Sequence, residues 1–204
     1  MMELSGFYFI TDRGLSTKPD VDAVRDAVEG GAKIVQYREK YLPRDEMLAK
    51  SKEMEAICRG RALFIINDFA DIAAECDADG VHIGQDDLDY VMARELLGPE
   101  KIIGVTVHDT VEVMAAVEAG ADYLGASPIY ATKTKKDAGK PAGIKLIEDI
   151  KAFCDTPIAA IGGIDESNVI PVIAAGADMV CAISATVAKK NIRDAVEVFA
   201  KMME

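Results

Sequence analysis

Eight short runs of apolar residues recur along the chain, and segments with helical spacing separate them. The runs are nearly continuous in apolar character rather than alternating, as in strands that are buried on both faces. The intervening segments, such as 20–31, 44–60 and 110–120, carry apolar residues at helical period. The predicted strands are 6–11, 33–39, 63–68, 80–85, 101–106, 123–128, 157–162 and 179–184. A strand followed by a helix, eight times, predicts a (β/α)8 barrel.

An internal repeat supports this architecture. Its four copies are EGGAKIV (29–35), CDADGV (76–81), EAGADYL (118–124) and AAGADMV (174–180). Three copies close a helical run with a glycine suited to the left-handed position that ends helices, namely Gly31, Gly120 and Gly176. The copies precede predicted strands two, four, six and eight, which favours a barrel over an open doubly wound sheet. We therefore predict an α/β fold, a single-domain (β/α)8 TIM barrel over residues 1–204.

Composition narrows the class of protein. Half of the 204 residues are hydrophobic, enough for a substantial core, and the net charge of −12 argues against general nucleic-acid binding. The four cysteines form no CxxC pair, which is typical of buried thiols in a reducing compartment. The first twelve residues have neither the basic region nor the long apolar run of a signal peptide. No apolar stretch is long enough to span a membrane. We expect a cytoplasmic protein that acts without a membrane.

Polar side chains gather where the predicted strands end, which is where barrels carry their chemistry. Gln36, Arg38 and Lys40 share one parity of the second strand and so point to one side. Two cations and an amide there indicate an anion site, and a solvated basic rim is the alternative. Asn67 and Asp68 end the third strand, where either could instead cap the next helix.

Three acids follow the fourth strand. Asp86, Asp87 and Asp89 are candidates to cap the following helix, since acids favour a helix N-terminus. The alternative is a Mg²⁺ site shared with Asp68, because this ion accepts a few carboxylates completed by phosphate oxygens and water.

The two histidines, His82 and His108, lack a nearby His or Cys partner in the sequence, which argues against a zinc site. We interpret His82 as a hydrogen-bonded structural residue.

The residues at the ends of the last three predicted strands indicate a phosphate-binding site. Glycines and small residues after strands seven and eight let backbone N–H groups approach a phosphate, and they are Gly162, Gly163, Ser184 and Ala185. Ordinary turn glycines are the alternative. The segment 130–143 after strand six holds four lysines and one acid within an acidic chain. We interpret this segment as a functional loop over phosphates.

The chain resembles the thiamine phosphate synthase family over essentially its whole length. The resemblance rests on FITD (9–12), VQYREK (35–40), IIND (65–68), GVHIGQDDL (80–88), IIGVT (102–106), GASPIYATKTKK (125–136), AIGGI (160–164) and AIS (182–184). It implies that a hydroxymethylpyrimidine diphosphate and a thiazole phosphate condense to thiamine monophosphate and pyrophosphate. It also implies a dissociative reaction, in which diphosphate leaves before the thiazole nitrogen attacks.

The resemblance implies a role for particular residues. Arg38, Lys40 and Lys135 would be catalytic, and Asp68 and Asp87 would bind the cofactor Mg²⁺. The pyrimidine diphosphate would contact Gln36, Tyr37, Arg38, Glu39, Lys40, Asn67, Thr106 and Lys135. The thiazole phosphate would contact Thr132, Thr134, Gly163, Ile183 and Ser184. Thr106 stands where the family more usually has serine, and Tyr37 where it commonly has leucine.

Two other functions fit the same fold. A thiazole tautomerase would need a general acid or base near strand six, where GASPIY offers no histidine. A non-catalytic sensor of phosphorylated ligands need not retain metal ligands, so the presence of Asp68, Asp87 and Lys135 argues against it. The expected partners are small phosphorylated substrates, and the sequence leaves a homo-oligomer open.

Overall fold

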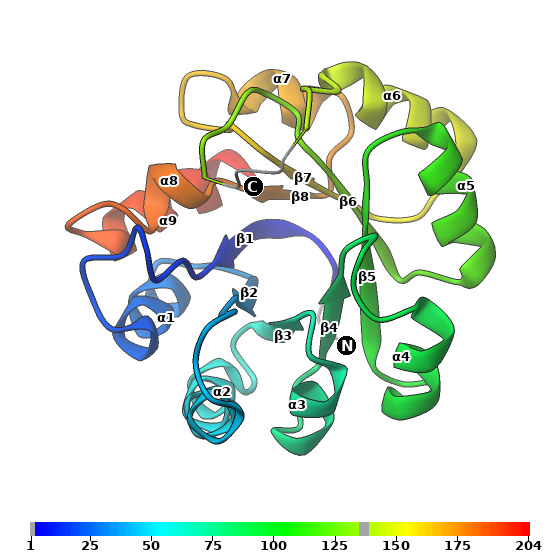
Figure 1. Cartoon of the computed structure of the whole chain (residues 1–204). Coiled ribbons are helices and arrows are strands. Elements are labelled where there is room, and N and C mark those ends of the chain that lie inside the picture. The colour runs from blue at the N-terminus through cyan, green and yellow to red at the C-terminus, as the bar shows by residue number, and fades with distance from the viewer. Residues whose placement is uncertain (1–2, 135–138) are drawn as a thin grey trace.

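The computed structural model describes residues 3–134 and 139–204. Within them, eight parallel strands pair in chain order, and β1 closes the barrel against β8 (Figure 1). The strands are β1 (Gly6–Ile10), β2 (Ile34–Tyr37), β3 (Leu63–Asn67), β4 (Gly80–Ile83), β5 (Ile102–Val107), β6 (Tyr123–Ala126), β7 (Ile158–Ile161) and β8 (Met179–Cys181). The predicted barrel is confirmed, and the open sheet is wrong.

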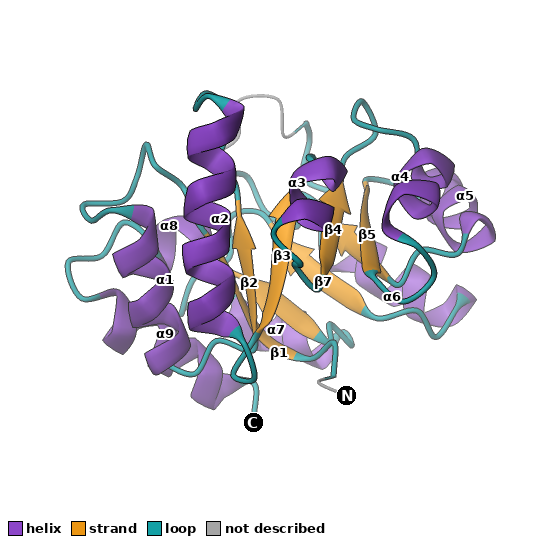
Figure 2. Ribbon diagram, turned by 90° about the horizontal axis from the view of Figure 1, so that it is seen from below, coloured by secondary structure: helices purple, strands orange, loops and turns teal. Residues whose placement is uncertain are grey.

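Helices surround this barrel and follow the strands in alternation (Figure 1). They are α1 (Asp20–Glu29), α2 (Arg44–Cys58), α3 (Ala70–Glu75), α4 (Tyr90–Leu97), α5 (Thr110–Ala119), α6 (Ile144–Phe153), α7 (Val169–Ala174), α8 (Ile183–Thr186) and α9 (Ile192–Met202). Seen from the side, the strand arrowheads and the loops after them lie at the end of the barrel opposite to the N-terminus (Figure 2).

The last predicted strand is partly wrong. Strand β8 ends at Cys181, and the residues predicted to extend it form the short helix α8. The Thr186 hydroxyl donates to the carbonyl of Ala182 at 2.7 Å and so closes this turn. The apolar character of the sequence alone does not distinguish a buried strand from the buried first turn of a helix.

Two apolar layers explain why the strands lack alternation. One layer fills the barrel and includes Tyr8, Ile65 and Tyr123. The other lies between the strands and the helices, where Phe64 and Val180 belong to one continuous core. Each strand therefore buries both faces, as the sequence predicted.

The repeated junctions tie the strands together at the amino end of the barrel. The carboxylates of Asp79, Asp122 and Asp178 each precede an even-numbered strand, and each accepts a backbone N–H from the odd-numbered strand before it, at 2.7–2.8 Å. The first copy has Lys33 at this place, which has no acceptor to offer.

The glycines of three of these junctions have the predicted conformation. Gly31, Gly120 and Gly176 have φ of 95°, 93° and 103°, in the left-handed region that glycine adopts most readily.

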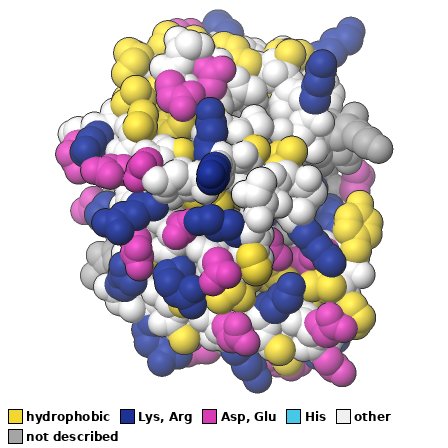
Figure 3. Space-filling view, turned by 90° about the vertical axis from the view of Figure 1, so that its left-hand side faces the viewer, with side chains coloured by type: hydrophobic (Ala, Val, Ile, Leu, Met, Phe, Trp, Pro, Cys, Tyr) yellow, Lys and Arg dark blue, Asp and Glu magenta, His cyan; other side chains and the backbone are white. Residues whose placement is uncertain are grey.

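The outer surface mixes charges of both signs. The face that carries α1, α8 and α9 shows acidic and basic side chains interspersed with small apolar areas (Figure 3). Ion pairs such as Arg193–Glu29, which joins α9 to α1, belong to this face.

The described part of the chain contains no helix long and apolar enough to cross a membrane. All four cysteines lie in that described part and are free thiols, three of them buried.

Candidate active site

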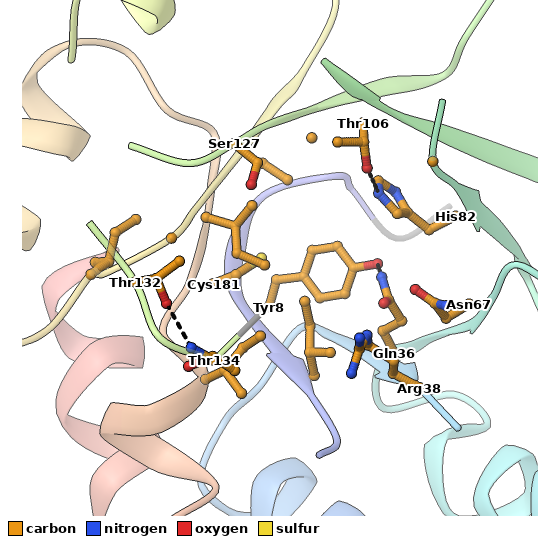
Figure 4. Close-up of a pocket in the computed structure, with 18 of the residues that line it drawn as sticks. Tyr8, Gln36, Arg38, Asn67, His82, Thr106, Ser127, Thr132, Thr134 and Cys181 are labelled. Carbon is orange, nitrogen blue, oxygen red and sulfur yellow. Dashed lines mark hydrogen bonds between the residues drawn. The ribbon is translucent and has the colours of Figure 1, made fainter. Parts of the chain in front are cut away.

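A cavity opens at the carboxyl end of the barrel, with an empty volume of about 1040 Å³ that includes space open to solvent. Its walls come from all eight strands or the loops that follow them. Side chains from opposite sides of the barrel point into this cavity (Figure 4). Of the fourteen predicted site residues that the structure describes, twelve line it. They are Gln36, Arg38, Lys40, Asn67, Asp68, Asp87, Thr106, Thr132, Thr134, Gly163, Ile183 and Ser184.

The predicted parity of strand β2 is correct. Gln36, Arg38 and Lys40 all line the cavity, although Arg38 and Lys40 follow the last strand residue. The Arg38 guanidinium lies 3.6 Å from the Asp12 carboxylate, which keeps it at the rim. The Lys40 ammonium lies 3.0 Å from the Asp68 carboxylate. Both cations thus line the cavity, and each is paired with a carboxylate.

Tyr37 and Glu39 have the opposite parity, and their side chains do not line the cavity. Tyr37 is buried in the layer between strands and helices. The Glu39 carboxylate accepts the backbone N–H groups of Lys40 and Tyr41 at 2.8 and 2.7 Å, so it shapes the loop that carries Lys40. Alternation along the chain turns both side chains away from the cavity, and the predicted contacts of Tyr37 and Glu39 with the pyrimidine diphosphate stay a prediction.

Two carboxylates meet beside the Lys40 ammonium. Burial raises the pKa of Asp68, and so does a hydrogen bond that protonated Asp68 can donate to the neighbouring Asp87 carboxylate, while Lys40 opposes this shift. Asp68 also has φ of 65°, in the left-handed region that is uncommon for residues other than glycine. A positive charge near Asp68 stabilises its ionised form, and the Lys40 ammonium supplies one.

The alternative capping roles are resolved residue by residue. Phe69 precedes α3, and neither Asn67 nor Asp68 caps this helix. Asp89 caps α4 by accepting the Val91 N–H at 2.8 Å. Asp87 instead accepts the Gly84 N–H at 2.8 Å and faces the cavity.

Asp86 does not line the cavity, which supports Asp87 as the second carboxylate of the site. Among the described residues, no three His, Cys, Asp or Glu side chains gather into a metal-binding group. A metal here would therefore rely on two carboxylates, as the sequence predicted.

The far wall of the cavity comes from the loops after β6, β7 and β8. The Thr134 N–H donates to the Thr132 hydroxyl at 3.2 Å, which gives this loop a compact turn (Figure 4). Gly163 has φ of 65°, and a Cβ on it would lie 2.5 Å from the Ala131 carbonyl oxygen. Only glycine lets the two loops approach so closely. The predicted residue Lys135 lies outside the described residues.

Four further residues line the cavity that the sequence did not assign to it. Tyr8, His82 and Tyr123 come from the strands and form its floor, and Ser127 follows β6. His82 is hydrogen-bonded as expected, with one ring nitrogen 2.9 Å from the Tyr123 hydroxyl and the other 2.8 Å from the Thr106 hydroxyl. The inward parity of Tyr8 on β1 was the available signal, because a tyrosine in a barrel interior needs a polar partner.

Comparison with known proteins identifies the family. Residues 7–186 match the family described as thiamine monophosphate synthase. The chain belongs to the thiamine monophosphate synthase family. A thiamine-phosphate synthase of Methanosarcina barkeri is 48% identical over 97% of this chain and 90% of its own length. One from Methanospirillum hungatei is 43% identical over 97% of both chains.

Solved structures agree with the family. Thiamine phosphate pyrophosphorylase from Pyrococcus furiosus has a TM-score of 0.90 and 38% identity, covering 97% of this chain and 95% of its own. A 3-hexulose-6-phosphate synthase structure has a TM-score of 0.71 at 16% identity over 98% and 100% of the two chains, which indicates a shared fold alone. The family resemblance predicted from the sequence motifs is confirmed.

Proposed function

We propose that this protein is a thiamine phosphate synthase, a transferase that joins a hydroxymethylpyrimidine diphosphate to a thiazole phosphate. The C–O bond to diphosphate breaks, the thiazole nitrogen forms the new C–N bond, and pyrophosphate leaves with the electron pair. The observation that carries this proposal is one cavity whose two walls suit two anions. Cations and carboxylates line the β2–β4 wall, and threonines and glycine line the β6–β8 wall.

The diphosphate belongs on the β2–β4 wall. Arg38 and Lys40 place positive charge at the cavity rim, where they would neutralise the charge that develops on the leaving diphosphate. Gln36, Asn67 and Thr106 line the adjoining surface and would hold the pyrimidine. Lys135, from the 130–143 segment, completes this set in the proposal.

The thiazole phosphate belongs on the opposite wall. Barrels commonly bind phosphate with the loops after strands seven and eight and the N-terminus of a short extra helix. The short helix α8 follows β8 directly and carries Ile183 and Ser184 on the cavity wall. Gly163 lies after β7, and Thr132 and Thr134 lie after β6.

Asp68 and Asp87 fit a Mg²⁺ ion. Their carboxylates lie together in a partly buried position where the pKa of Asp68 is raised, and a cation between them would relieve this cost. When bound, Mg²⁺ would supply charge neutralisation to the diphosphate. The protein's own contribution is to orient both substrates and to hold Arg38 and Lys40 against the leaving group.

A product assay tests this function. The purified chain is mixed with both phosphorylated substrates, with and without Mg²⁺, and thiamine monophosphate and pyrophosphate are both quantified. We expect both products in equal amounts and only with the metal. Binding of thiazole phosphate without any coupling would instead favour the tautomerase or the sensor.

We also propose a cytoplasmic location, because the cysteines of the chain are free thiols, as is usual in a reducing compartment.

A further inference from the structure

A continuous chain of hydrogen bonds crosses the floor of the cavity. The Gln36 amide Nε2 donates to the Tyr8 hydroxyl at 2.8 Å, and the Tyr8 and Tyr123 hydroxyls lie 2.8 Å apart. The chain continues from Tyr123 to His82 and from His82 to Thr106, at 2.9 and 2.8 Å. Its two ends, Gln36 and Thr106, come from different sides of the barrel and both line the cavity (Figure 4).

The barrel interior is shaped to hold this chain. A Cβ on Gly125 would lie 2.8 Å from the His82 ring, and a Cβ on Gly104 would overlap the Tyr123 ring. Both glycines lie in strands, where they leave the space that the two rings occupy. Tyr8 and Tyr123 are 1% and 0% exposed. Burial raises the pKa of both hydroxyls, so both keep the single proton that each can donate.

The single proton of each hydroxyl gives the chain a direction. Because Gln36 donates to Tyr8, the Tyr8 proton is available to Tyr123, and the Tyr123 proton is available to the facing nitrogen of His82. That nitrogen, Nδ1, then accepts, and the proton of the neutral ring lies on Nε2. The Nε2–H donates to the Thr106 oxygen, which leaves the Thr106 proton for a ligand.

We propose that Tyr8, Tyr123 and His82 are positioning residues that form a directional relay between Gln36 and Thr106. In the direction described, Gln36 keeps its carbonyl oxygen for the cavity and presents an acceptor. Thr106 then presents a donor. Reversing one end reverses every bond between them, so the hydrogen-bonding group that one end presents is coupled to the group presented by the other.

This inference rests on the proposed function for its ligand. An aminopyrimidine carries an N–H donor beside ring nitrogens that accept, so it matches one acceptor end and one donor end. The relay would fix this match before the substrate arrives, at no cost in reorganisation during binding. The relay itself is a property of the free protein and can be measured without substrate.

The position of the His82 proton reports the direction of the relay. The chain has two histidines, so ¹⁵N-labelled histidine gives two ring systems, and His108→Gln assigns them. At pH 8 we expect the His82 ring to be neutral with its proton on Nε2. A ring protonated on Nδ1 alone, an even mixture of both forms or a doubly protonated ring would overturn the stated direction.

Substitution of Gln36 tests transmission, since Gln36 is separated from His82 by two tyrosines. In Gln36→Glu the ionised carboxylate can only accept, so Tyr8 must donate to it and each following bond reverses. We expect the His82 proton to move from Nε2 to Nδ1 at a pH where the ¹³C shift of the new carboxyl shows it ionised. Retention of the Nε2 proton would mean that no relay reaches His82.

Two further variants separate the relay from a change in local charge. Gln85→Glu makes the same chemical change next to Thr106, whose carbonyl the Gln85 amide contacts at 2.6 Å outside the relay. We expect it to leave the His82 proton on Nε2. Adding Tyr8→Phe to Gln36→Glu breaks the chain and should cancel the reversal. Reversal by Gln85→Glu, or reversal that survives Tyr8→Phe, would refute the relay.

These outcomes are independent of catalysis. If the His82 proton behaves as expected and no thiamine monophosphate forms, the proposed function fails and the relay stands. If product forms and the His82 proton does not respond to Gln36, the relay fails alone.

Discussion

The two ends of the barrel hold their carboxylates in different surroundings. At the amino end, Asp122 and Asp178 each accept a backbone N–H and pair with a cation, Arg94 or Lys151. At the carboxyl end, Asp68 lies beside a second carboxylate, and its pKa is raised. Asp68 pairs with Lys40 and Asp87 accepts the Gly84 N–H, so the acids of both ends have partners within the protein. The difference is that Asp68 and Asp87 lie side by side and line the cavity.

Among substitutions that distinguish the two ends of the barrel, Asp87→Asn at the carboxyl end should have the largest effect on catalysis. Loss of this carboxylate should lower kcat/KM by about 10²–10³-fold, the size typical of removing one electrostatic contact to a transition state. Steady-state kinetics over a range of Mg²⁺ concentrations would measure it. The matched control is Asp86→Asn, whose carboxylate lies outside the cavity. Equal losses in the two variants would remove Asp87 from the site.

Lys135→Ala should lower turnover about 10²-fold, because the lysine would no longer neutralise the negative charge of the departing diphosphate. Circular dichroism and the melting temperature should stay unchanged. Lys140→Ala removes a lysine from the same 130–143 segment and is the control, with turnover close to that of the parent protein. Near-normal turnover of Lys135→Ala would remove this lysine from the mechanism.

At the amino end, Asp122→Ala should cost stability rather than catalysis. The Ile103 N–H and the Arg94 guanidinium lose their acceptor, which costs about 1–3 kcal/mol for an unsatisfied hydrogen-bonding group. Urea unfolding would measure the change, with kcat/KM at 25 °C as the comparison. A large fall in kcat/KM in a protein that stays folded would contradict the division between the two ends.

Thr106 tests how much a single hydroxyl contributes at the carboxyl end. Thr106→Val should raise KM for the pyrimidine diphosphate about tenfold, corresponding to about 1.4 kcal/mol of binding. Thr106→Ser keeps the hydroxyl and should stay within about threefold of the parent. A serine variant as impaired as the valine variant would show that shape, not the hydroxyl, matters at this position.

The smallest expected effect is a gain in stability from Asp68→Asn. The folded-state pKa of Asp68 is raised, so its ionised form costs stability at pH values above that pKa, and this cost vanishes below the pKa of the unfolded chain. Without Mg²⁺ the variant should therefore melt higher than the parent at pH 8, with about 2–4 °C corresponding to about 1 kcal/mol. The gain should shrink as the pH falls towards 4. A lower melting temperature at pH 8 would mean that the Lys40–Asp68 pair stabilises the free protein.

Most of the fold followed from the sequence because period and repeat are local signals. The eight apolar runs and the left-handed glycines, such as Gly120, correspond to the strands and the helix ends of the barrel. Helix α8 was missed because Ala182 and Ile183 are as apolar as the strand before them. That residues 1–204 fold as one domain stays a prediction.

The site was predictable where strand parity applied and less so elsewhere. Parity placed Gln36 and Arg38 in the cavity, and it turns the side chains of Tyr37 and Glu39 away from it. The floor was harder to foresee, because the Tyr8–Tyr123 contact joins residues 115 positions apart in the sequence. Pairings at such distance depend on the closure of the barrel and leave no local pattern.

The most direct test of this account is the product assay run in parallel on the parent protein, Asp87→Asn and Asp122→Ala. We predict Mg²⁺-dependent thiamine monophosphate and pyrophosphate from the parent and from folded Asp122→Ala, and at least about a hundredfold less from Asp87→Asn. No product from the parent with Mg²⁺ and both substrates, or equal rates from the parent and Asp87→Asn, would contradict the account.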